Sequence, residues 1–176
     1  MNEKSNRGVY ESPISIVYFG HIFGINIIIE TSDCTTGLQI MKDMSLADAT
    51  KLVETAKSKA TEIEVPMCIA IMDAGANLVA FERMDDALLA SIDIAQNKAY
   101  TSVTLKLETQ TVHEVSQPGE SLYGIGSTNG GRIVTFGGGF PLTDGDAVVG
   151  AIGVSGGSVE EDIEVAEAAI DRFAEL

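Results

Sequence analysis

The stretch GAIGVSGGSVEED, residues 150–162, joins an apolar run to an acidic one and decides how the C-terminal part of the chain folds. The residues that lead into it, Ala147 to Val154, are short, apolar and rich in valine, which predicts a buried strand. Ser158 is followed three residues later by Glu161, the spacing of a capping box at a helix start. The sequence therefore predicts a strand, a tight exit and a helix from Ser158 to about Phe173.

The four glycines of this stretch raise the question of a phosphate-binding loop. Such a loop needs a lysine and a hydroxyl residue directly after its glycines, to supply charge and a metal ligand. Here Ser158 is followed by three acids in the first helical turn, Glu160 to Asp162. Those acids suit the positive end of the helix dipole and disfavour a bound phosphate. We expect the glycines to serve the backbone instead, through close packing or a positive φ.

Upstream, the hydrophobic periodicity predicts two helices with a hairpin between them. Residues from Ser45 to about Glu64 repeat apolar side chains at helical spacing, with Ser45 as the capping residue. Met67–Asp73 and Leu78–Arg83 are short apolar runs around the turn AGAN, which is typical of a hairpin. Helical periodicity returns from Leu88 to Leu105.

Between the second and last helices, the pattern weakens into a long glycine-rich connection. Glu108–Gly131 carries one short helical turn, expected at Thr109–Val115. Arg132–Phe136 reads as a strand, followed by a loop, GGGFPLTDGD, whose Asp144-Gly145 pair is a strong turn signal. Hairpins in such an order favour an antiparallel sheet with helices packed on it over a doubly wound parallel sheet.

The composition limits the classes of partner. The 176 residues suffice for one domain with an extension. Twenty-six acids against eleven bases give a net charge of −15, which disfavours nucleic acid and anionic membrane surfaces. Cys34 and Cys68 lack the spacing of a zinc site or a disulfide framework. No motif indicates NAD or ATP, and we expect a reducing, cytoplasmic location, with secretion as the alternative.

The N-terminal region, residues 1–43, is treated as an extension of uncertain status. Its apolar run Ile14–Ile29 is shorter than the roughly 20 residues of a membrane helix, and no small-residue cleavage site follows it. Its β-branched residues also suit one or two strands, with Gly20 and Gly24 as breaks. A third interpretation places the natural start at Met41 or Met44.

Several separate motifs resemble one family. The segments DAGANLVAFERMD, SIDIAQNKAYTS and GGRIVTFGGGFPLTDGDAVVGAIGVSGG, with the acidic helix after them, closely resemble the GlcG/HbpS family of DUF336 type, which includes the C-terminal domain of PduO-type proteins. The resemblance covers about Ser45 to Leu176, so residues 44–176 are assigned to this domain. It implies an α+β fold: a profilin-like α/β sandwich with a roughly five-stranded antiparallel sheet, assembled as a homo-oligomer. Some members bind or degrade haem, and others accompany glycolate or diol utilisation.

Two cations stand at positions that match the family motifs. Arg83 and Lys98, on an otherwise acidic chain, suit the propionates of a tetrapyrrole or another carboxylate ligand. The alternative is an ordinary salt bridge, Arg83 with Asp85 or Asp86 and Lys98 with Asp93 or a helix carboxyl.

Haem binding would also need an axial ligand, most often histidine. The chain has two, His21 and His113, and His113 lies in the long connection, where a side chain can reach a cleft or a neighbouring subunit. The alternative for His113 is a solvated surface histidine. Other candidates for ligand contact or coordination are Tyr100, Tyr123, Met72 and Met84.

The function inferred from sequence is binding of haem or a related tetrapyrrole by an oligomer, linked to haem handling or to glycolate or diol utilisation. Ser155 lacks both the nucleophile elbow and a nearby histidine, which argues against a hydrolase. A binding protein is favoured over an enzyme, with haem degradation implied only by the resemblance. The alternatives are a non-catalytic assembly module, or a small-molecule sensor or enzyme that holds a carboxylate through Arg83 or Lys98.

Overall fold

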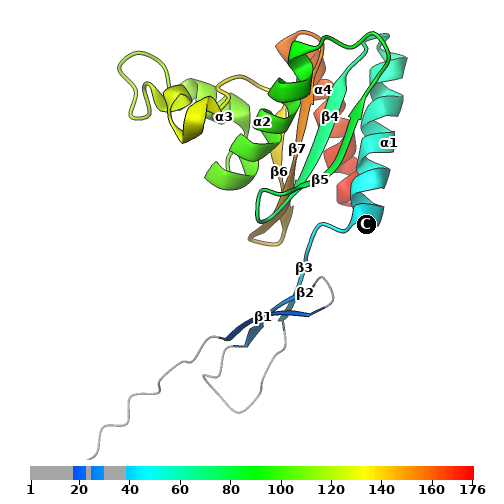
Figure 1. Ribbon diagram of the computed structural model, residues 1–176, viewed down its shortest axis with the longest axis vertical. Helices are drawn as coiled ribbons and strands as arrows, with labels where there is room; N and C mark the ends of the chain where they lie inside the picture. The colour runs from blue at the N-terminus through cyan, green and yellow to red at the C-terminus, as the bar shows by residue number, and fades with distance from the viewer. Residues whose placement is uncertain (1–17, 23–24, 30–38) are drawn as a thin grey trace, which may run out of the picture. The chain divides into compact units, whose positions relative to one another are not determined.

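The computed structural model describes residues 18–22, 25–29 and 39–176, which belong to two compact units, the first ending at Met41 and the second beginning at Lys42 (Figure 1). In the first unit, β1 (Tyr18–Ile22) pairs antiparallel with β2 (Ile25–Ile29), and β3 (Gln39–Lys42) lies next to β2. Of the interpretations open for this apolar run, the structure supports strands. Gly20 pairs with Ile27 inside β1 and is no break, while Gly24 lies outside the described residues. Within the described part of the chain, no helix is long and apolar enough to span a bilayer.

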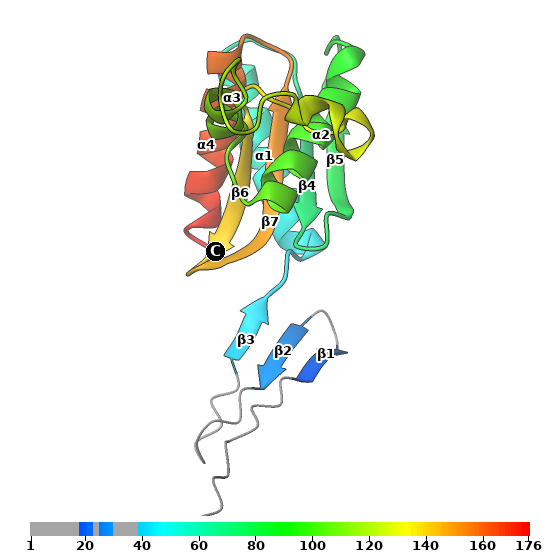
Figure 2. The same ribbon diagram turned by 90° about the vertical axis from the view of Figure 1, so that its left-hand side faces the viewer.

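The second unit is built on a four-stranded antiparallel sheet in the order β5-β4-β7-β6 (Figure 2). The strands are β4 (Cys68–Asp73), β5 (Leu78–Arg83), β6 (Gly139–Asp144) and β7 (Ala147–Ser155). The hairpin of β4 with β5 is the predicted one, whereas β6 with β7 forms around the predicted turn but takes its first strand from residues that were expected to be loop. Gly145 has a φ of 59° in the second turn, as the Asp144-Gly145 signal required. The expectation of about five strands was wrong by one.

The strand that the sequence pattern predicted at Arg132–Phe136 does not form. There the hydroxyl of Thr101, in the neighbouring helix, accepts a hydrogen bond from the backbone N–H of Val134 at 2.9 Å and lies 3.3 Å from the Arg132 carbonyl. A helix side chain thus takes the place of a strand partner. The glycine-rich residues predicted as a loop form β6 instead. A Cβ at Gly139 would lie 2.8 Å from the Lys98 carbonyl, so only glycine lets β6 start this close to the helix.

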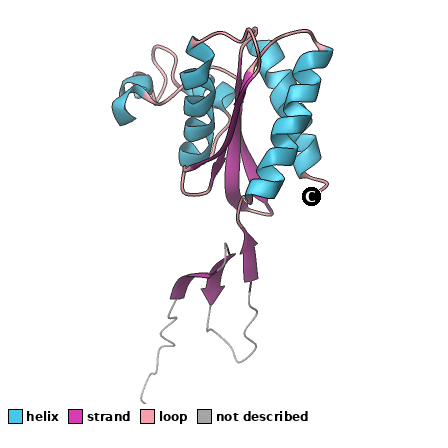
Figure 3. Ribbon diagram, turned by 45° about the vertical axis from the view of Figure 1, so that its right-hand side comes forward, coloured by secondary structure: helices cyan, strands magenta, loops and turns pink. Residues whose placement is uncertain are grey.

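Helices cover both faces of the sheet, which gives the expected α+β sandwich (Figure 3). α1 (Leu46–Glu62) and α4 (Val159–Phe173) pack on one face and α2 (Ala90–Leu105) on the other. After α2 comes a segment that we call the excursion, residues 107–136. It holds α3 (Thr109–Val115) and the short 3₁₀ helices η1 (Ile125–Ser127) and η2 (Asn129–Gly131), and projects beside α2 in Figure 1.

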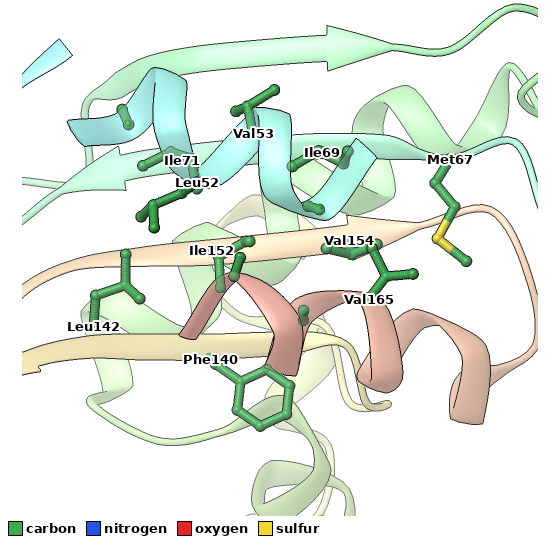
Figure 4. Close-up of a cluster of buried hydrophobic side chains, with 14 of the residues drawn as sticks. Leu52, Val53, Met67, Ile69, Ile71, Phe140, Leu142, Ile152, Val154 and Val165 are labelled. Atoms are coloured by element: carbon green, nitrogen blue, oxygen red, sulfur yellow. The ribbon is translucent and has the colours of Figure 1, made fainter. Parts of the chain in front are cut away.

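The two faces of the sheet have different cores. Large aliphatic side chains such as Leu52, Ile69 and Ile152 fill the side of α1 and α4 (Figure 4). The α2 side is lined mainly by small residues, among them Ala70, Ala95, Ala99 and Ala151. α2 therefore lies very close to the sheet. A Cβ at Gly153 would collide with the Ala95 carbonyl oxygen and would lie 2.5 Å from the Ala99 nitrogen.

The glycine turn after β7 is already hydrogen-bonded within the chain. Gly156 and Gly157 donate their backbone N–H groups to Asp162 Oδ1 at 2.9 and 3.1 Å. The predicted capping box is confirmed: the Ser158 N–H donates to Glu161 Oε2 at 2.7 Å, and the Ser158 hydroxyl accepts from the Glu161 N–H at 3.3 Å. These amides serve the helix start, as the steric and capping interpretation expected.

Candidate functional site

Lys98 is buried between α2, β7 and the start of α4. Its ammonium donates to Asp162 Oδ2 at 2.6 Å and to the Val154 carbonyl at 2.8 Å, and lies 4.9 Å from the centre of the Phe136 ring. The side chain has no exposed surface. Burial lowers the pKa of Lys98 and raises the pKa of Asp162, while each charge opposes the shift of the other.

The carboxylate that pairs with Lys98 therefore belongs to the chain itself and not to a ligand. The sequence allowed a partner on a helix, and Asp162 in the first turn of α4 is that partner. Asp93 was the wrong candidate, because its carboxylate accepts from the Asn97 side chain at 2.9 Å. Carboxylate ligand binding by Lys98 stays a prediction. In the structure its ammonium stabilises the fold through hydrogen bonds to Asp162 and the Val154 carbonyl.

Arg83 lies at the end of β5 and is exposed. Its Nη1 donates to the Ala87 carbonyl at 3.3 Å, and the described residues show no ion pair between Arg83 and Asp85 or Asp86. Directly opposite in register stands Cys68, a buried free thiol whose pKa is raised by burial. Arg83 as a ligand-binding residue stays a prediction.

His113 lies on α3 with its ring exposed and one nitrogen held. Its Nδ1 is 3.0 Å from the Thr135 carbonyl, which can only accept a hydrogen bond, so this contact favours the tautomer with the proton on Nδ1. The lone pair of a neutral ring then resides on Nε2. The Gln117 amide donates to the His113 carbonyl at 2.8 Å, and its nitrogen lies 3.3 Å from Nδ1 and 3.4 Å from Nε2 of the ring.

Exposed apolar side chains gather in the same part of the chain. Among residues 43–176, nine large hydrophobic residues are exposed, and four of them lie in the excursion: Leu107, Leu122, Tyr123 and Phe136. The loop after α3 folds back on it, since the Leu122 N–H donates to the Val115 carbonyl at 3.0 Å. Phe136 is adjacent to Thr135, the residue that holds the His113 ring. The excursion thus carries an exposed histidine and four exposed apolar side chains.

A cluster that sequence reasoning missed centres on Arg132. Its guanidinium carbon lies 3.6 Å from the centre of the Tyr100 ring, and its Nε donates to Asn97 Oδ1 at 3.2 Å. Asn129 donates to the Tyr100 hydroxyl at 3.2 Å. Tyr100 is therefore part of a polar cluster, whereas Tyr123 is 68 % exposed. The sequence signal that could have indicated this cluster is the pair Asn97 and Tyr100, which lie three residues apart on one helix face.

This geometry defines a class of α+β domain. In it α2 packs closely on the sheet, and the excursion carries the histidine and the arginine. Residues 44–171 match the family model described as haem degrading protein HbpS-like. The chain belongs to the HbpS-like family, as the sequence motifs predicted.

Curated relatives support the same assignment. The chain is 46 % identical over 138 residues to an uncharacterized 15.0 kDa protein in the dhaT-dhaS intergenic region of Citrobacter freundii, covering 78 % of this chain and 97 % of that protein. It is 41 % identical over 127 residues to the corrinoid adenosyltransferase PduO of Salmonella typhimurium, covering 72 % of this chain but 38 % of PduO. Protein GlcG of Escherichia coli is 29 % identical over 61 % of this chain and 77 % of GlcG.

Solved structures share the fold. Klebsiella pneumoniae ORFY, of the DUF336 family, superposes with a TM-score of 0.76 at 40 % identity over 82 % of this chain and 99 % of that one. The PduOC:heme complex gives 0.72 at 40 % identity, over 73 % and 94 %. HbpS gives 0.69 at 24 % identity, over 80 % and 98 %, which shows the likeness of fold.

Proposed function

We propose that this chain binds haem or a related tetrapyrrole on the surface of the excursion, with His113 Nε2 as the axial ligand. The observation that carries the proposal is the contact between His113 Nδ1 and the Thr135 carbonyl. Histidines that bind metals usually donate their other ring N–H to a carbonyl or carboxylate, which fixes the ring and its tautomer. The solved haem complex of a 40 % identical relative supports the ligand class.

The residues present fit such a group. A porphyrin is flat and largely apolar, and the excursion exposes Phe136 and Tyr123 beside a histidine-bearing helix. The Thr135 carbonyl holds the imidazole, and the Gln117 side chain would have to move away from Nε2 for iron to approach. When bound, haem would supply the redox and ligand-exchange chemistry of its iron. This chain would supply the ligand, its orientation and an apolar surface.

A haem titration of the purified protein tests the proposal. We expect a Soret band that saturates at one haem per chain. His113→Ala should weaken binding and shift the band, because the iron loses a nitrogen ligand. Glu114→Gln is the matched control, since Glu114 is the exposed next residue on α3 and should leave the spectrum unchanged.

Two results would count against it. No spectral change with the wild-type protein would overturn haem binding altogether. An unchanged spectrum for His113→Ala would move the ligand elsewhere, and Tyr123→Phe would then test the phenolate oxygen.

We also propose that the chain forms a homo-oligomer through the segment before α2. Leu88 and Leu89 are 63 % and 74 % exposed in adjacent positions. Full burial of such a side chain contributes about 1.5–3 kcal/mol, so two copies that cover each other's leucines would gain substantially. Light scattering should give a multiple of 18.6 kDa, reduced by Leu89→Glu but not by Leu46→Glu, an exposed leucine of α1. A monomeric wild-type protein would contradict this.

The alternative function is a non-catalytic assembly module, and the haem titration and the light-scattering measurement together distinguish it from a haem-binding protein. A stable oligomer that binds no haem would favour it. A cytoplasmic location and a link to glycolate or diol utilisation stay predictions from the sequence.

A further inference from the structure

Arg132 has hydrogen-bonding capacity that the fold does not use. Five other cations of the described residues form ion pairs: Lys51, Lys57, Lys59, Lys98 and Arg172. Arg132 forms none, and among the described residues its guanidinium makes one hydrogen bond, to the Asn97 amide oxygen, and one cation–π contact, with the Tyr100 ring. Both Nη groups, which carry four of the five guanidinium N–H donors, have no partner among the described residues.

The guanidinium is nevertheless fixed in place. Asn97 donates its amide N–H to Asp93 Oδ2 at 2.9 Å, which directs its oxygen to Arg132 Nε at 3.2 Å. The Tyr100 ring supports the guanidinium plane at 3.6 Å, and Asn129 holds the Tyr100 hydroxyl. A guanidinium that is already oriented loses little further freedom when it binds, which favours affinity.

The approach to Arg132 from the preceding residues is open. Gly130 and Gly131 have φ values of 68° and 80°, and a Cβ at either would have no atom within 4 Å. Arg132 itself is half-buried. The space beside these two glycines, directly before Arg132 in the chain, is therefore unfilled.

We infer that Arg132 binds a carboxylate, which lies in the plane of the guanidinium and accepts from its free N–H groups. Arginine forms two parallel hydrogen bonds with a carboxylate, and its single charge equals that of one carboxylate. The carboxylate belongs either to a propionate of a bound tetrapyrrole, in which case the inference rests on the proposed function, or to a free small organic acid. Arg132 is thus a third candidate for the carboxylate-binding cation, beside Arg83 and Lys98.

The experiment uses probes that separate Arg132 from His113. Metal-free protoporphyrin IX keeps the propionates and lacks iron, whereas haem dimethyl ester keeps iron and lacks free carboxylates. Arg132→Gln should weaken protoporphyrin IX binding about tenfold or more and leave haem dimethyl ester binding unchanged. His113→Ala should do the reverse. Succinate, followed by tyrosine fluorescence, covers the free organic acid, and Tyr100 under the guanidinium is the expected reporter.

Lys106→Gln is the control for charge, since Lys106 is exposed at the end of α2 and its loss changes the net charge equally. Arg132→Lys keeps the charge and loses the fork, so it should also bind carboxylate probes less tightly, and it serves if Arg132→Gln fails to fold. Carboxylate binding that Arg132→Gln lowers and Lys106→Gln does not lower supports the inference, whichever probe reveals it. The inference is overturned if wild type binds neither carboxylate probe, or if the Arg132 variants bind them as wild type does. Loss of haem dimethyl ester binding alone bears on His113 and not on Arg132.

Discussion

The ammonium of Lys98 and the carboxylate of Asp162 lie 2.6 Å apart and join α2 on one face of the sheet to the start of α4. Both side chains are almost completely buried, and Asp162 also accepts the two N–H groups of the glycine turn. One ion pair therefore fixes three elements: α2, the turn after β7 and the first turn of α4.

Asp162→Asn should strongly destabilise the domain. Asparagine keeps an oxygen for the turn amides but leaves the Lys98 charge buried without its counterion, and removal of one partner of a buried pair costs about 3–5 kcal/mol. Denaturant unfolding measures the loss. Glu175→Gln is the control, because the Arg172–Glu175 pair is exposed and should contribute at most about 1 kcal/mol. Equal stability of the two variants would show that the buried pair contributes no more than a surface one.

The buried thiol of Cys68 should make stability fall at alkaline pH. Burial raises the pKa of Cys68 above its ordinary value of 9.0, an effect that the charge of Arg83 opposes. The unfolded chain therefore loses this proton at lower pH than the folded chain does, and the free energy of unfolding decreases as pH rises through 9.0, by at most about 1.4 kcal/mol per pH unit.

Denaturant unfolding at pH 7 and pH 10 tests this in a Cys34→Ser background, which leaves Cys68 as the sole thiol. The loss of stability should be smaller once Cys68→Ala is added. An identical loss in both proteins would show that the thiol does not contribute.

Local sequence patterns correctly predicted the helix caps and the hairpin turns, which depend on interactions between residues close in sequence. Ser45 and Ser158 cap their helices, and both hairpins form around the expected turns, because caps and turns depend on residues only a few positions apart. The β-branched residues after Arg132 were wrongly read as a strand. Strand formation needs a partner with free backbone groups, and there Thr101 of α2 takes that place.

The contacts of the candidate site join residues that are far apart in the sequence, so local patterns could not predict them. Lys98 and Asp162 are 64 positions apart, and Arg132 and Asn97 are 35 apart. Each was visible as a charged or polar residue, but many carboxylates were available to Lys98, and nothing local selected Asp162. His113 could be selected from the sequence because the 176 residues contain two histidines. Its contact with the Thr135 carbonyl could not be predicted, because the fold brings the two residues together.

Gly153→Ala should test why glycines recur along β7. A methyl group there would collide with the carbonyl oxygen of Ala95 in α2, and backbone atoms on both sides leave no flexible side chain to yield. Because α2 would have to move off the sheet and would carry Lys98 away from Asp162, we expect a loss of about 3 kcal/mol or more. Gly126→Ala is the control, since its nearest contact would be an ordinary 3.6 Å from the Ile133 carbonyl and the change should stay within about 1 kcal/mol. Thermal and denaturant unfolding measure both variants, and a Gly153→Ala protein as stable as wild type would mean that α2 does not need this close approach.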